Sequence, residues 1–291
     1  MPTENARLRL FARLFTRPTF ASLAKSKDWR YPLAYLQQHG LLKTDKPRPL
    51  STLFDTAWEE LKSSYRNEYV YKNEIANRIA FGRHRPHTAS LHIELPVGRS
   101  IVDVAVFNGT STAYEIKTEF DSARRLHSQT SDYLKAFSQV YVVTHPSLAE
   151  AYKQSVDDAV VILVLSRDAS LQTIRHAKLD IERLDHSTMF RCLRRPEYES
   201  ALSRCFKHVV GLPNGLIGRA CGEAFAGLDR AQAHGIYVSA LRSRRIQLPT
   251  ATFLTNLPIS LRAVGCATPL SQRQQSVVAE LLMQPIPVSL A

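Results

Sequence analysis

The first part of the chain, up to about residue 82, carries apolar residues at the spacing of amphipathic helices. Four sets of apolar residues follow this spacing: Leu8, Leu10, Phe11, Leu14 and Phe15; Tyr31, Leu33, Tyr35 and Leu36; Leu53, Trp58 and Leu61; and Tyr69, Ile75, Ile79 and Phe81. Gly40 and Gly82 indicate helix ends, and Pro47 and Pro49 indicate a break between helices. The pattern therefore predicts a helical N-terminal part.

The pattern changes after Gly82 to runs that favour strands. Strands are expected at 90–97, 100–107, 111–118, 139–144 and 159–165, with helices at about 121–137 and 146–154. The last two strands are continuous apolar runs separated by a helix. Because such runs are typical of strands buried on both faces, we expect these two to be parallel.

From about His186 the sequence returns to helical patterns, with Arg242, Arg244 and Arg245 near the end of one helix. The tail after Pro249 is less regular, although 272–283 favours a last helix. A mixed α/β core flanked by helical N- and C-terminal regions is the fold class that accounts for this order of elements.

Charge and composition indicate which classes of binding partner are favoured. The net charge is +12 and the pI is about 9.7, which favours a polyanion, nucleic acid ahead of membrane. No run approaches the length of a membrane span, and the N-terminus has no apolar signal core, so we expect a cytoplasmic protein with no membrane partner. Cys192, Cys205, Cys221 and Cys266 match no zinc spacing and are interpreted as reduced thiols.

The segment from Asp103 to Lys117 indicates chemistry, because it combines two acids and a lysine in a predicted hairpin. A two-residue Asn108-Gly109 loop would pair Asp103 with Tyr114 and put Glu115 on the other face. A three-residue loop that includes Thr110 would instead pair Asp103 with Glu115 and place Lys117 on the same face. The sequence does not decide between these two loops. Only a loop with an odd number of residues, or a bulge, places the two carboxylates on the same face of the hairpin.

In the three-residue register, the two carboxylates can hold Mg²⁺ or Mn²⁺, with the backbone carbonyl of Ile116 as a further ligand. Lys117 can orient an attacking water or neutralise charge on a phosphate. The competing interpretation is a charged strand edge that arises by chance. Glu94 and Glu119 lie near these acids in the sequence and are interpreted as solvated strand-end charges rather than ligands.

The chain resembles the PD-(D/E)XK, or restriction-endonuclease-like, nuclease superfamily in the order helix, three strands, helix, strand, helix, strand. Asp103 and Glu115-Ile116-Lys117 stand on the second and third of these strands. It is similar, more closely, to an uncharacterised bacterial family associated with phage and mobile elements. The segments that carry this resemblance are Arg66–Asn73, Ser111–Glu119, Asp121 and Arg125–Gln129.

The resemblance implies an αβββαβ core with a mixed sheet at 65–180, between a basic helical region at 1–64 and a helical region at 181–291. It implies that Asp103, Glu115 and Lys117 are the metal and catalytic set. Glu68 is expected to complete the set, with Glu74 as its competitor, and Gln129 to contact a metal water or a phosphate. Val102 stands where the superfamily usually has proline, which is a departure from the pattern.

Several side chains are candidates for nucleic-acid contact. Arg83 and Arg85 lie in a basic loop, and Arg124 and Arg125 begin the helix after the motif. Solvated loop and helix faces are the competing interpretations. Tyr65, Tyr69 and Tyr71 could stack on bases, but packing against the sheet is favoured. The arginines at 7, 9 and 13 are equally consistent with a nucleic-acid arm and with a solvated helix face.

These observations predict a Mg²⁺- or Mn²⁺-dependent nuclease that acts on DNA, ahead of RNA, in phage defence or mobile-element biology. The alternative is a catalytically inactive nuclease-fold protein that binds DNA or RNA or has a regulatory role. A third hypothesis is a protein-interaction component of a defence or mobile-element system. A homodimer or a defence-system protein is the expected protein partner.

Overall fold

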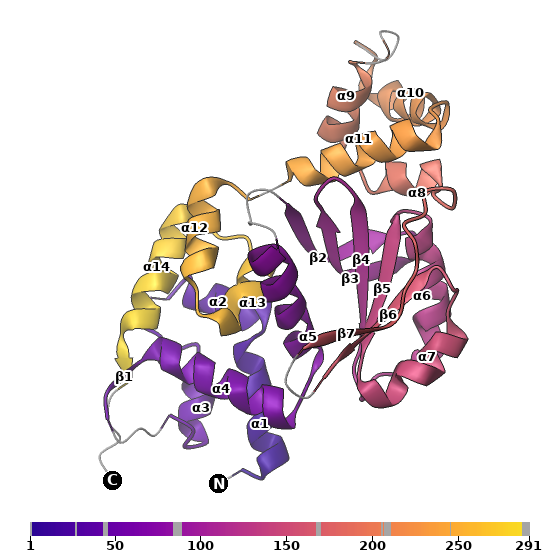
Figure 1. The fold of residues 1–291 in the computed structure, drawn as a ribbon. Coiled ribbons are helices and arrows are strands. Elements are labelled where there is room, and N and C mark those ends of the chain that lie inside the picture. The colour runs from indigo at the N-terminus through magenta and orange to yellow at the C-terminus, as the bar shows by residue number, and fades with distance from the viewer. Residues whose placement is uncertain are drawn as a thin grey trace. The chain divides into compact units, whose positions relative to one another are not determined.

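The computed structural model describes residues 2–26, 28–42, 46–83, 89–166, 170–204, 206, 211–244 and 246–286 (Figure 1). The chain divides into two compact units. Met1–His87 and Ile246–Ala291 form one, which we call the helical unit, and Thr88–Arg245 forms the other, which we call the sheet unit. No helix in the described residues is both long and apolar enough to cross a bilayer.

The helical unit consists of short helices with a two-stranded sheet. Its elements are α1 (Glu4–Leu14), α2 (Arg17–Leu23), α3 (Ala34–Gln38), β1 (Arg48–Pro49), α4 (Leu50–Ser64), α5 (Glu68–Ile75), the π-helix η1 (Ala76–Arg83), α12 (Leu248–Asn256), the 3-10 helix η5 (Ile259–Leu261), α13 (Arg262–Ala267), α14 (Gln272–Met283) and β8 (Pro285–Ile286). The amphipathic pattern of α1 is confirmed, because Leu8, Phe11 and Leu14 are buried while Arg9 and Arg13 are exposed.

Aromatic residues form part of the core of the helical unit. The ring of Phe15 stacks on that of Tyr69 at 4.9 Å between centroids, and Trp58 meets Tyr69 edge-on at 5.9 Å. The Tyr69 hydroxyl donates a hydrogen bond to the carbonyl of Ser260 at 2.7 Å. Tyr71 is 1% exposed. Tyr69 and Tyr71 are therefore core residues, as the preference for packing over base stacking implies, but Tyr69 packs on Phe15 and Trp58 within the helical unit, where packing against the sheet was expected.

The sheet unit contains a six-stranded sheet in the order β2-β3-β4-β5-β6-β7. The strands are β2 (Ser90–Val97), β3 (Ser100–Phe107), β4 (Ser111–Lys117), β5 (Gln139–Thr144), β6 (Val160–Leu165) and β7 (Leu171–Arg175). The helical segments are η2 (Ala123–Arg125), α6 (Leu126–Leu134), η3 (Pro146–Leu148), α7 (Ala149–Ser155), α8 (His186–Arg191), α9 (Arg195–Leu202), α10 (Asn214–Ala226) and α11 (Arg230–Ser243). A mixed α/β fold with flanking helices is thus confirmed.

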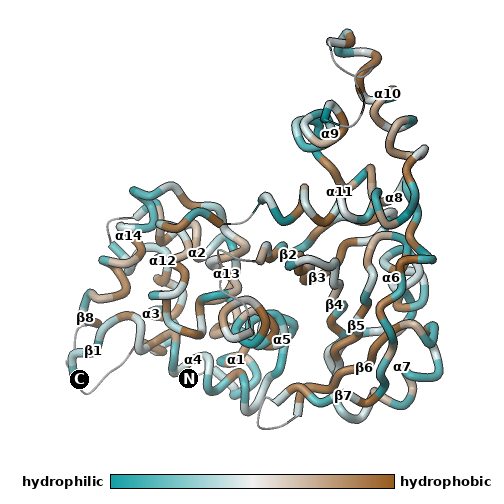
Figure 2. Tube along the Cα trace, turned by 45° about the horizontal axis from the view of Figure 1, so that its top comes forward, coloured by the Kyte–Doolittle hydropathy of each residue, from teal (hydrophilic) through white to brown (hydrophobic). Residues whose placement is uncertain are grey.

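The centre of the sheet is parallel and the two sides are antiparallel. β4, β5 and β6 run parallel to one another, whereas β2, β3 and β7 join by antiparallel pairing. All six residues of β6 are buried, and β5 and β6 are strongly hydrophobic in Figure 2. The predicted pair of parallel strands buried on both faces is confirmed, since valine-rich runs of this kind need cover on each side.

The structure differs from the sequence expectations in two places. The tail after Pro249 is regular, because it forms the helices α12 and α13 before the predicted α14. A sixth strand, β7, lies at the edge of the sheet, and three of its five residues are exposed. The two compact units place α5 in the helical unit and 181–245 in the sheet unit, and the division into regions 1–64, 65–180 and 181–291 stays a prediction.

Candidate functional site

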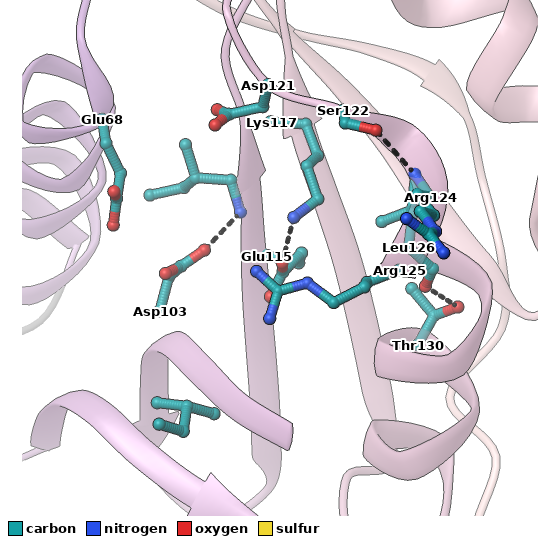
Figure 3. Close-up of polar contacts among 12 residues, drawn as sticks. Glu68, Asp103, Glu115, Lys117, Asp121, Ser122, Arg124, Arg125, Leu126 and Thr130 are labelled. Carbon is teal, nitrogen blue, oxygen red and sulfur yellow. Dashed lines mark hydrogen bonds and ion pairs between the residues drawn. The ribbon is translucent and has the colours of Figure 1, made fainter. Parts of the chain in front are cut away.

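The turn between β3 and β4 sets the geometry of the site. Phe107 pairs with Ser111 and Val104 with Tyr114, so the loop is the three-residue Asn108–Thr110. Gly109 occupies φ +113°, a conformation that glycine adopts without strain. The same register continued by one residue places Asp103 opposite Glu115, and the Ile116 N–H donates to Asp103 Oδ2 at 2.8 Å (Figure 3). The three-residue register is confirmed, and pairing of Asp103 with Tyr114 is excluded.

Glu115 and Lys117 form a buried ion pair on β4. Lys117 Nζ lies 2.7 Å from Glu115 Oε1, and the residues are 8% and 1% exposed (Figure 3). They are the buried charged residues of the sheet unit, within the part that the structure describes. A buried charge is tolerated only when it is paired and hydrogen-bonded, and the contact between Lys117 and Glu115 meets this condition.

Tyr133 of α6 holds the second oxygen of Glu115. Its hydroxyl lies 2.7 Å from Glu115 Oε2 and 2.6 Å from the carbonyl oxygen of Ile101, and its single proton can be donated to one acceptor at a time. Burial raises the pKa of Tyr133 well above its ordinary value of 10, and the negative charge of Glu115 acts in the same direction. Tyr133 is therefore a neutral hydrogen-bond donor that fixes the Glu115 carboxylate.

Gln129 lies one turn before Tyr133 and brings an unsatisfied acceptor to the same region. Its Oε1 is buried and has no hydrogen-bond partner among the described residues. A buried acceptor without a donor is costly, so this oxygen is suited to accept a hydrogen bond from a water or a ligand. The hydrogen bond from Tyr133 to Glu115 was not predicted from the sequence.

Glu94 of β2 marks a break in the sheet beside Asp103. The pairs on either side, Ile93 with Val104 and Leu95 with Val102, place Glu94 opposite Asp103. Glu94 has φ +59°, a left-handed conformation that is rare for a residue other than glycine. The interpretation of Glu94 as a strand-end charge is wrong in its position, since it lies in the middle of the strand, although its side chain is exposed.

The break also changes which faces of β2 and β3 are buried. Both Val102 and Ala105 belong to one core cluster, although they are three positions apart along the strand. Regular alternation would put these two side chains on opposite faces. Asp103 lies within this break, half-buried, where the strand changes face. Bulges and kinks of this kind re-aim side chains next to functional sites.

Three other acids named from the sequence contact residues outside the hairpin. Glu68 and Glu74 are both on α5, in the helical unit. Glu68 pairs with Lys72 at 2.6 Å, and Glu74 pairs with Arg78 at 3.3 Å. Glu119 follows β4 and lies 4.0 Å from His145. A catalytic part for Glu68 stays a prediction.

The arginines predicted to contact nucleic acid lie in different parts of the chain. Arg124 and Arg125 form the exposed turn η2 that leads into α6, and the Ser122 hydroxyl accepts a hydrogen bond from the Arg124 N–H at 3.2 Å (Figure 3). Arg83 is the last residue of the π-helix η1. Arg85 lies outside the described residues. Contact of these four arginines with nucleic acid stays a prediction.

The donors fit a hard divalent cation that keeps much of its water. Mg²⁺ is commonly held by one or two carboxylates with several waters, and Asp103 and Glu115 supply two carboxylates from adjacent strands. The unsatisfied Gln129 Oε1 suits a water bound to such a cation. Across the described ranges, no group of three or more His, Cys, Asp or Glu side chains could enclose a metal. Asp103 and Glu115 are thus the residues that would hold Mg²⁺ or Mn²⁺.

Comparison with known proteins places the chain in a family. The family described as "Bacteriophage P4 protein cII" matches residues 61–226, which is more than half of the chain. The chain belongs to this protein cII family. The match extends from the end of α4 to the end of α10 and includes Asp103, Glu115 and Lys117. No solved structure matches the chain.

One curated relative carries the family name. Protein cII of Enterobacteria phage P4 is 34% identical over 71 residues, which is 24% of this chain and 27% of that protein. The chain thus matches about a quarter of the length of this relative. The similarity supports a phage-associated family and says nothing about a reaction.

Proposed function

We propose that the protein is a metal-dependent phosphodiesterase that acts on DNA, with Asp103, Glu115 and Lys117 at its reacting centre. The observation that carries this proposal is the register of the β3–β4 hairpin, which sets Asp103 opposite Glu115 while Lys117 contacts Glu115. Membership of the protein cII family supports a setting in phage or mobile-element biology, including phage defence.

In this proposal, each residue of the site has a separate chemical role. Asp103 and Glu115 hold the cation, with the Ile116 carbonyl as a further candidate ligand. Once bound, a divalent cation lowers the pKa of a water and stabilises the negative charge that develops on phosphate. Tyr133 keeps Glu115 oriented through its hydrogen bond, and Lys117 donates to the reacting phosphate or the attacking water. Gln129 Oε1 accepts from a water in the same space.

The test is hydrolysis of fluorescently labelled DNA in the presence of Mg²⁺ or Mn²⁺. We expect Asp103→Asn and Glu115→Gln to lose activity by about a hundredfold or more, because each removes a charged ligand. Lys117→Met should lose about a hundredfold, because it removes the cationic donor. In thermal melts, Mn²⁺ should raise the Tm of the wild type, and Asp103→Asn should reduce that shift.

Matched controls separate a lost site from a lost fold. Glu119→Gln removes a nearby acid, and Lys153→Met removes an exposed lysine, so both should keep full activity. Lys117→Met alone leaves Glu115 as a buried unpaired charge and should lower stability. The double variant Glu115→Gln/Lys117→Met removes both charges, so it should regain stability and remain inactive. Hydrolysis that persists in Asp103→Asn and in the double variant would refute the proposal.

A second candidate function is nucleic-acid binding without hydrolysis. It is favoured by the complete pairing of Glu115, whose two oxygens contact Lys117 and Tyr133, and by the lack of a three-ligand cluster in the described residues. This alternative expects DNA or RNA binding that is unchanged by Mn²⁺ and by Asp103→Asn. A homodimer or a defence-system protein partner remains compatible with either function.

A further inference from the structure

The positive charge of the chain is concentrated in the helical unit. The residues of that unit include 18 Lys and Arg against 9 Asp and Glu, which gives a net charge of +9. The sheet unit has 20 Lys and Arg against 17 Asp and Glu, which gives +3. Three quarters of the net charge therefore lie outside the unit that contains Asp103 and Glu115. Net charge acts on the association of a protein with polyanions, so the helical unit is the better candidate for contact with them.

Within the helical unit, the charge is densest near the N-terminus. Residues 5–39 contain seven Lys and Arg and one acid, Asp28, which pairs with Arg30 at 3.1 Å. Arg9 and Arg13 lie four residues apart, so they occupy one face of α1, and the apolar residues of that helix are buried on the opposite side. Arg17 begins α2 three residues after α1 ends, and it is exposed. These arginines form a cationic edge along the α1–α2 junction.

An exposed aromatic residue lies four positions before Tyr35, a tyrosine that contacts this edge. The guanidinium of Arg13 lies 4.2 Å from the centre of the Tyr35 ring, which brings the segment around α3 against α1. Tyr31 precedes Tyr35 by four residues and is 83% exposed, the highest value among the large apolar residues described as exposed. A tyrosine this exposed contributes little to the core. An exposed aromatic ring beside arginines is the combination that single-strand binders use, with the ring stacking on a base and the cations along the backbone.

We propose that Arg9, Arg13, Arg17 and Tyr31, which we call the arginine–tyrosine face, bind single-stranded DNA. The arginines contact successive phosphates, and Tyr31 stacks on a base. The proposal goes beyond hydrolysis, because it assigns DNA binding to the helical unit while the reacting residues lie in the sheet unit. It relies on the proposed function only for the choice of DNA as the polyanion.

The experiment measures binding of the full chain to a 5′-fluorescein-labelled dT30 strand by fluorescence anisotropy, with EDTA present so that no metal-dependent hydrolysis occurs. At 0.15 M NaCl, the triple variant Arg9→Ala/Arg13→Ala/Arg17→Ala should bind about tenfold or more weakly, and its log Kd should depend on log[NaCl] with a slope smaller by about 2. Tyr31→Ala should bind about tenfold more weakly, whereas Tyr31→Phe should bind as the wild type does.

A charge-matched control tests the location of the site. The variant Arg99→Ala/Arg204→Ala/Arg219→Ala removes three exposed arginines from the sheet unit and should keep binding within about twofold. Equal weakening by both triple variants would overturn the proposal, because net charge alone would then explain the binding. Thermal melts confirm that each variant is folded, and all substituted arginines are exposed.

Binding to anionic vesicles and binding to duplex DNA test two other possible ligands for this face. If the chain binds anionic vesicles of phosphatidylserine through this face and binds dT30 equally with and without the three arginines, the proposal is wrong. Preference for a 30-bp duplex over dT30, with no effect of Tyr31→Ala, would also overturn it. Binding through this face by a chain that never cleaves DNA would support the proposal and count against the nuclease. DNA cleavage by a chain whose DNA binding is unaffected by substitution of these residues would support the nuclease and count against this binding face.

Discussion

At the scale of single residues, Glu94 is the position where the backbone departs most from what its side chain prefers. A residue with a Cβ at φ +59° carries strain of about 1 kcal/mol or more, and glycine does not. We therefore expect Glu94→Gly to be more stable than Glu94→Ala by about 1 kcal/mol, measured by urea unfolding. Both variants lose the same carboxylate, so the difference isolates the backbone. Equal stability of the two variants would show that β2 relaxes when Glu94 is replaced.

The pairing of Asp103 with Glu115 could be predicted only in part from single residues. Asn108-Gly109 suits a two-residue turn as well as a three-residue one, so composition leaves the register open. The structure decides it through the Phe107–Ser111 pair. The left-handed Glu94 and the hydrogen bond from Tyr133 to Glu115 have no local signal, because each depends on a neighbouring element.

At the scale of elements, one partly buried ion pair joins the end of α11 to the start of α9. Arg244 donates two hydrogen bonds to Glu197, both at 2.6 Å, and the side chains are 12% and 14% exposed. We expect Arg244→Met to lower the free energy of unfolding by about 2 kcal/mol, because it leaves a partly buried carboxylate without its charged partner. The control Arg230→Met breaks the exposed pair with Glu182 and should cost less than about 1 kcal/mol. Similar losses in both variants would contradict this difference.

The same pair predicts a dependence on pH. Burial acts to raise the pKa of Glu197, but hydrogen bonds from the Arg244 side chain and the Arg194 N–H outweigh it and hold the pKa below its ordinary 4.5. A carboxyl whose folded-state pKa is lowered stabilises the fold above its ordinary pKa, and this stability is lost as the pH falls through the lowered value. The difference in unfolding free energy between wild type and Arg244→Met should therefore be constant above pH 4.5 and shrink below it. Urea titrations at several pH values would measure it.

Elements with a strong period were predictable, and those without one were not. The strands β5 and β6 and the helix α14 carry clear patterns, and they form as predicted. The helix α12 was not predicted, because the residues after Pro249 show no regular pattern, although proline is well accommodated in the first turn of a helix, where it lies here. The edge strand β7 has mostly exposed residues, so no burial pattern marks it.

At the scale of the whole molecule, the division into units depends on contacts between distant parts of the sequence. β1 pairs with β8 through Arg48 with Ile286 and Pro49 with Pro285, which closes the N-terminal helices onto the C-terminal ones. Neither two-residue strand carries a sequence pattern that indicates which strand it pairs with. A division based on the order of residues therefore gives continuous regions with boundaries at 64 and 180. The helical unit, in contrast, is formed from both ends of the chain.

This arrangement makes the sheet unit the part of the chain that is continuous and separable. We expect a fragment of residues 88–245 to unfold in one cooperative transition, because it contains the whole six-stranded sheet and its core cluster. If the proposals above hold, the fragment should keep Mn²⁺-dependent hydrolysis at high DNA concentration, because Asp103, Glu115 and Lys117 lie within it. It should bind dT30 about tenfold or more weakly than the full chain, because the arginine–tyrosine face is absent. A fragment that folds and binds dT30 as tightly as the full chain would place the DNA contacts in the sheet unit instead.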